Sequence, residues 1–82
     1  MNEKTINLNL ALLFLTGWEE DSTRTPGEKI FRSWKGYLFE ILNTMEERGL
    51  IHQIKNGKSV ILSQKGIQQA QEFVSKMKEA GL

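Results

Sequence analysis

Few residues of this 82-residue chain have the type and spacing that catalysis or metal binding requires. The chain has no cysteine, and its one histidine, His52, has no cluster of carboxylates beside it in the sequence, so no zinc site is expected. Glu46 and Glu47 are consecutive on a predicted helix and point about 100° apart, which does not suit a paired acid and base. Gly57-Lys58-Ser59 lacks the first glycine of a phosphate-binding loop. The sequence therefore predicts no enzyme, no cofactor and no metal.

Basic side chains offer the more informative chemistry. The formal net charge is only +1, but residues 1–22 carry one basic and four acidic side chains, whereas residues 23–82 carry ten basic and six acidic ones. Such an uneven distribution can indicate a partner even where the total charge does not. The basic side chains gather in one run and one pair, and these are our candidate phosphate contacts: Arg24, Lys29, Arg32 and Lys35, then Lys55 and Lys58.

The length of the chain limits the architecture that positions these residues. Eighty-two residues make one small domain, residues 1–82, whose stability is marginal unless it dimerises. The longest apolar run, Leu10 to Leu15, is too short to span a bilayer. No pattern typical of a signal peptide is seen at the start, so we expect a cytoplasmic protein.

The first half of the chain predicts two helices. Residues from about Thr5 to Trp18 are apolar on nearly every side, which predicts a helix central to the core or shared with a partner. A polar loop over residues 19–22 follows. A short helix is predicted from Pro26 to about Ser33. Thr25 suits its N-cap, proline suits its first position, and Glu28 stands three residues after the cap, as in a capping box.

The second half predicts a helix, a hairpin and a final helix. The apolar spacing from Tyr37 to Arg48 is that of an amphipathic helix. Asn56-Gly57 lies between two β-prone runs and predicts a hairpin with a two-residue turn, in which Ile51 faces Leu62 on the core side and both turn residues have positive φ. Ser63 then caps a helix over about 64–80.

One stretch resembles a known family. Residues 41–51 read L-x-x-x-E-x-x-G-L-I at their end, a basic hairpin follows, and V-I-L-S-x-x-G opens the next helix. This pattern resembles bacterial winged helix-turn-helix regulators of the multiple-antibiotic-resistance and phenolic-acid-response repressor type. Trp34-Lys35-Gly36-Tyr37 is also similar to a family of small, functionally uncharacterised bacterial winged-helix proteins. The implied fold class is α+β, mainly helical: a winged helix with three N-terminal helices, a β-hairpin wing and a C-terminal helix.

The resemblance implies a DNA-binding regulator or an accessory protein of a mobile element. In it, the helix at 37–48 enters the major groove of double-stranded DNA with Asn43 and Thr44 near the bases, and the wing tip touches phosphate. The regulators that the chain resembles dimerise through their first and last helices, and both predicted helices are strongly apolar here. A homodimer is therefore expected.

Two other functions remain open from the sequence. Glu40, Glu46 and Glu47 lie on the presumed recognition helix and would repel DNA, which favours a winged-helix module that binds proteins instead. A dimer that senses a ligand in an apolar pocket is the third possibility. Two interpretations also remain open for the aromatic side chains: they belong to the core, or they form an exposed surface that binds a partner. These residues are Trp18, Phe31, Trp34 and Phe39.

Overall fold

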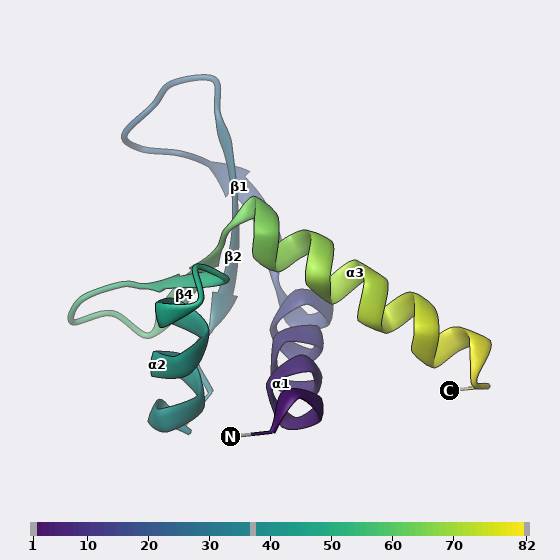
Figure 1. Cartoon of the computed structure of the whole chain (residues 1–82). Coiled ribbons are helices and arrows are strands. Elements are labelled where there is room, and N and C mark those ends of the chain that lie inside the picture. Colours follow the sequence, from purple (N-terminus) through teal and green to yellow (C-terminus); the bar gives the residue numbers. More distant parts are fainter. Residues whose placement is uncertain (1, 37, 82) are drawn as a thin grey trace.

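The computed structural model describes residues 2–36 and 38–81 and shows a small α+β fold (Figure 1). In this part of the chain, three helices and four strands follow one another in the order α1, β1, β2, α2, β3, β4, α3. Their bounds are α1 Glu3–Thr16, β1 Trp18–Asp21, β2 Lys29–Trp34, α2 Phe39–Glu47, β3 Ile51–Gln53, β4 Ser59–Leu62 and α3 Gln64–Glu79.

The four strands form one antiparallel sheet in the order β1-β2-β4-β3. β4 lies between strands from both halves of the chain, since Leu62 pairs with Phe31 on one side and with Ile51 on the other. The predicted register of the β3–β4 hairpin is confirmed. Its turn differs from the prediction, because Asn56 has a positive φ of 61° and Gly57 does not.

The helices cover one face of this sheet. Because neighbouring residues of a strand point to opposite faces, Phe31, Leu62 and Ile51 share one face, and Val60 joins them two residues along β4. These side chains pack against α1, α2 and α3. The buried cluster holds Ile6, Leu10, Leu13, Ile41, Leu42, Met45, Leu50, Ile51, Val60, Leu62 and Ala70.

The predicted short helix from Pro26 to about Ser33 is wrong, and so is the polar loop over residues 19–22. Both segments belong to the β1–β2 hairpin. Gly27 has a φ of +88° and the amide of Glu28 donates to the carbonyl of Thr25 over 3.1 Å. Proline followed by a glycine of positive φ is the pattern of a type II turn. The residues that read as a helix start therefore close a hairpin.

The winged-helix prediction is confirmed only at the level of an α+β fold with a β-hairpin before a C-terminal helix. Three N-terminal helices were expected, but α1 and α2 alone precede β3 in the described residues, and a hairpin separates them. The other helices follow their predictions within about two residues, although the predicted start at Tyr37 lies outside the described residues. None of the helices in the described ranges has the length and apolar character needed to cross a membrane.

Candidate functional site

None of the helices in residues 2–36 and 38–81 packs on the second face of the sheet, which carries a polar network among aromatic and aliphatic side chains. Trp18, Arg32, Ile61 and His52 lie side by side across the four strands on this face. Arg32 Nε donates to a carboxylate oxygen of Glu20, and Arg32 Nη1 donates to the hydroxyl of the buried Ser59 over 2.7 Å. The charge of Arg32 is therefore compensated within the fold.

Glu20 is held ionised by this network. The hydrogen bond from Arg32, joined by one from Trp18 Nε1 over 3.2 Å, lowers the pKa of the Glu20 carboxyl below the ordinary value of 4.5. Trp18 in turn lies 5.3 Å from Trp34, centroid to centroid, at a tilt of 55°. The two indoles and the ion pair form one connected group on the uncovered face.

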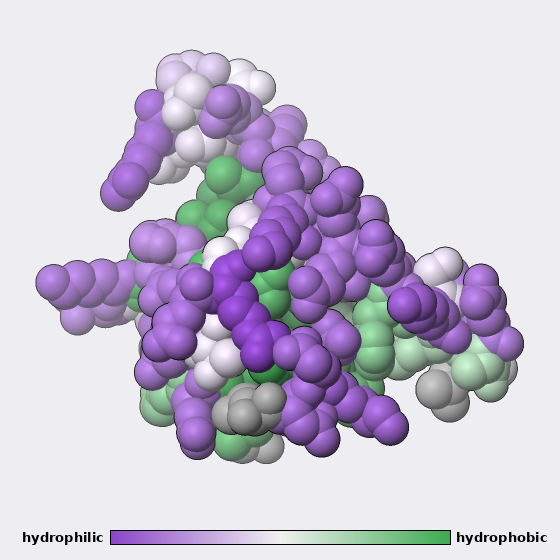
Figure 2. Space-filling view, in the orientation of Figure 1, coloured by the Kyte–Doolittle hydropathy of each residue, from purple (hydrophilic) through white to green (hydrophobic). Residues whose placement is uncertain are grey.

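A groove crosses this face between the two hairpins, and we call it the inter-hairpin groove. It holds about 390 Å³ and is lined by Ser22, Thr23, Arg24, Thr25, Ile30, Arg32, His52, Ile54 and Ile61. Figure 1 shows the β1–β2 hairpin rising at the top while the β3–β4 hairpin projects to the left. Figure 2 shows the notch between them, with hydrophobic surface in its depth and hydrophilic surface on both rims.

Lys29 and Arg32, predicted on a short helix, lie on the β1–β2 hairpin instead, and Arg24 lies on the same hairpin. Lys29 is paired with Asp21 across the hairpin, and Arg32 is paired with Glu20. Arg24 lies in the connecting loop, is exposed, and has no carboxylate within 4 Å among the described residues. Of the three, only Arg24 carries a charge that no neighbouring carboxylate compensates.

The remaining three predicted cations come together at the β3–β4 turn, and we call them the turn lysines: Lys35, Lys55 and Lys58. The amide of Lys35 donates to the carbonyl of Lys58 over 2.7 Å, and its ammonium lies 3.4 Å from the carbonyl oxygen of Ile54. None of the turn lysines forms an ion pair within residues 2–36 and 38–81. Phe39, which is 63% exposed, lies beside Lys35 and Lys58.

The two predicted base-reading residues lie on α2, but their polar groups are partly engaged. Asn43 is exposed and its Oδ1 accepts a 2.8 Å hydrogen bond from Gln53. Thr44 is half-buried and its hydroxyl donates to the carbonyl of Glu40 over 2.9 Å. Glu40, Asn43 and Glu47 follow one another along the exposed side of α2, so this side is acidic.

Glu46 has a structural role that the sequence did not suggest. Its Oε1 accepts the backbone N–H of Gln53 over 2.7 Å and lies 3.6 Å from His52 Nδ1. β3 is the edge strand of the sheet, so this carboxylate satisfies a donor that no further strand pairs with. Glu46 thus fixes α2 to β3.

Sequence reasoning missed the uncovered sheet face and its groove. The sequence of β2 gives no clear strand signal, because Ile30-Phe31-Arg32-Ser33-Trp34 does not alternate between apolar and polar residues.

Comparison with known protein families shows which family the chain matches. The model of a family described as a domain of unknown function, DUF6429, matches residues 1–80. No curated protein and no solved structure matches the chain significantly. No group of three or more His, Cys, Asp or Glu side chains that could hold a metal ion is found in the described part of the chain.

Proposed function

Since the chain belongs to the DUF6429 family, whose description names no activity, we propose from its geometry that the protein binds double-stranded DNA through the β3–β4 hairpin. The observation that carries this proposal is the convergence of the turn lysines without a carboxylate partner in the described residues. Lysines that neutralise phosphates release condensed counterions, which is the main source of sequence-independent affinity for DNA.

The shape of the hairpin supports the same proposal. β4 pairs with β2 as well as with β3, so the part of the hairpin that projects from the body of the molecule is its turn (Figure 1). A projecting turn that carries lysines can reach the phosphates of a DNA backbone. Arg24 on the opposite rim of the inter-hairpin groove adds a second cationic arm. The two arms would hold one DNA backbone between them.

This proposal moves the main contact from α2 to the hairpin. Glu40 and Glu47 on the exposed side of α2 oppose the close approach of a polyanion. The amide nitrogen of Asn43 has no acceptor among the described residues, so Asn43 stays a proposed base contact at the edge of the interface. Thr44 is a weaker proposal, because its hydroxyl hydrogen is already donated within the helix.

Few phosphate contacts per chain give weak binding, so a regulatory role requires two copies on one DNA site. Two linked modules raise the apparent affinity without any new contact. We therefore propose a cytoplasmic dimer that acts as a transcriptional regulator or as an accessory of a mobile element.

Fluorescence anisotropy with a labelled duplex of mixed sequence tests the hairpin contact. Lys55→Gln/Lys58→Gln should weaken binding at least tenfold, because two phosphate contacts are lost. The matched control is Lys76→Gln/Lys78→Gln, which removes the same charge from the last turn of α3. Equal affinities for the two double variants would contradict the assignment to the hairpin.

A second function is favoured by the acidic side of α2. Glu40 and Glu47 are exposed there, and the strongly exposed Phe39 precedes Glu40 at the start of the helix. This combination suits a basic, amphipathic protein segment. In that case the protein would not bind the duplex even at low salt, whereas a lysine-rich peptide would bind the wild type and not Glu40→Gln/Glu47→Gln.

A further inference from the structure

Helix α1 exposes an apolar stripe that carries no charge. Between Lys4 and Glu19 the chain has no charged residue. Leu8, Leu12 and Leu15 follow the i, i+4, i+7 spacing of one helix side and are 49%, 59% and 59% exposed. Soluble monomers rarely leave such a stripe open to water, because each leucine that becomes buried contributes about 1.5–3 kcal/mol.

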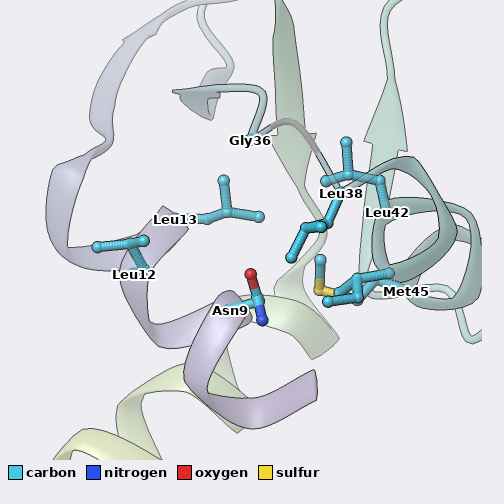
Figure 3. Close-up of a pocket in the computed structure, with 8 residues that line it drawn as sticks. Asn9, Leu12, Leu13, Gly36, Leu38, Leu42 and Met45 are labelled. Carbon is cyan, nitrogen blue, oxygen red and sulfur yellow. The ribbon is translucent and has the colours of Figure 1, made fainter. Parts of the chain in front are cut away.

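The stripe borders a hollow between α1 and α2. Leu12, Leu13 and Asn9 line it from α1, and Leu42 and Met45 line it from α2. Figure 3 shows Leu13 and Asn9 facing Leu38, Leu42 and Met45 across this space. The hollow holds about 120 Å³. Removal of one leucine side chain from a protein core leaves a cavity of similar size, roughly 150 Å³.

We propose that this surface binds a second copy of the chain, with α1 packed antiparallel against α1 of its partner and a leucine of each copy inserted into the hollow of the other. The surface is self-complementary, because it presents projecting leucines and a recess of leucine size side by side. Self-complementarity is what a two-fold symmetric interface requires. The outer edge of the surface is extended by Leu38, which lines the same hollow and is 48% exposed.

Area and charge both fit a second copy. The four exposed leucines offer on the order of 400 Å² of apolar surface per copy, about half of the roughly 800 Å² per partner in a standard interface. In the antiparallel arrangement, Leu8 of one copy meets Leu12 of the other near the two-fold axis. Lys4 then approaches the C-terminal end of the opposite α1, where a cation is favoured by the helix dipole. No like charges meet along the uncharged stripe.

The arrangement differs from dimerisation through the first and last helices. α3 already packs on α1 inside one chain, where Ala70 is buried and Gln69 donates to Asn7 over 2.9 Å. Its second half extends away from the body (Figure 1), with Phe73, Val74 and Met77 half-buried. The proposed interface therefore uses the side of α1 that α3 leaves open.

Sedimentation velocity of the full chain without DNA tests the proposal. The wild type should sediment as a dimer at about 50 µM and dissociate on dilution, as expected for an interface of this size. Leu8→Glu/Leu12→Glu should be monomeric and keep the wild-type far-UV circular dichroism, because the two side chains are 49% and 59% exposed. The control is Met77→Glu, which places a single negative charge on α3 and should leave the dimer intact.

Mixing two charged variants separates a lost interface from a lost fold. Leu8→Glu/Leu12→Glu and Leu8→Lys/Leu12→Lys should each be monomeric, and an equimolar mixture should form a heterodimer, since Leu8 of one copy meets Leu12 of the other. A wild type that stays monomeric at 100 µM would overturn the proposal. So would a dimer that Met77→Glu dissociates while Leu8→Glu/Leu12→Glu does not. Each result is independent of DNA binding, because no nucleic acid is present.

Discussion

Gly66 lies in the first turn of α3, where the backbone of Leu50 passes so close that a Cβ atom would overlap the Leu50 carbonyl oxygen. The hydroxyl of Ser63, the N-cap of α3, accepts a hydrogen bond from the amide of Gly66 over 3.0 Å and also donates to the carbonyl of Gly49 over 2.6 Å. The Ser-x-x-Gly pattern is thus explained by packing, since the glycine allows the close approach and the serine connects α3 to the end of α2.

Gly66→Ala should lower the free energy of unfolding by about 1–3 kcal/mol, because the added methyl group has to displace backbone rather than a flexible side chain. Urea denaturation measures the loss. Gly36→Ala is the control, since a Cβ at Gly36 meets no atom within 4 Å and its φ is not positive. Equal stability of both variants with the wild type would show that α3 does not pack on Leu50 in this way.

The network around Glu20 predicts a pH dependence. Because Arg32 and Trp18 lower the pKa of Glu20 in the folded state, the stability it contributes is present above pH 4.5 and is lost as the pH falls through the lowered pKa. Glu20→Gln should therefore be less stable than the wild type at pH 7, and the difference between their urea midpoints should shrink towards pH 3. A difference that is constant over this range would contradict the ion pair.

At the scale of elements, short sequence motifs predicted the turns and helix starts whose structure depends on neighbouring residues. Asn56-Gly57 between β-prone runs located the β3–β4 hairpin with its register, and Ser63 located the start of α3. The segment from residue 25 to residue 34 was misread because Thr25-Pro26-Gly27-Glu28 satisfies the rules for a helix start and for a type II turn alike. The pairing of β2 with β4, distant in sequence, decides between them.

In the candidate site too, contacts between residues distant in sequence could not be predicted from the sequence. Lys55 and Lys58 were predicted as a pair because they flank one turn, whereas Lys35 was assigned to the basic run with Arg24, Lys29 and Arg32. The ion pairs of Lys29 and Arg32 depend on carboxylates of the β1–β2 hairpin, which the sequence did not predict. The hollow beside Leu12 joins α1 to α2 across more than twenty residues of sequence, and no local pattern predicts such a contact.

The connection between α2 and β3 gives a prediction at this scale. Glu46→Ala should cost about 1–2 kcal/mol of stability, because the edge N–H of Gln53 loses a charged acceptor. Glu47→Ala removes the adjacent, exposed carboxylate and should be within about 0.5 kcal/mol of the wild type. Urea denaturation of both variants is the measurement. The opposite ranking would refute the role of Glu46 at the sheet edge.

At the scale of the whole molecule, the near-zero net charge conceals separated surfaces. One face of the sheet is filled by three helices, and the other carries the inter-hairpin groove between two arms with uncompensated cations. The uncharged stripe of α1 lies on a different element from the turn lysines. DNA binding and self-association can therefore occur together, each on its own surface.

The salt dependence of duplex affinity tests the central claim most directly. The slope of log affinity against log salt should fall by about 0.9 for each phosphate contact removed. Lys55→Gln/Lys58→Gln should therefore lower the slope by roughly 1.8 per bound chain. Lys76→Gln/Lys78→Gln should keep the wild-type slope. No binding at micromolar protein in about 50 mM salt, or one slope shared by all three proteins, would contradict DNA binding by the β3–β4 hairpin.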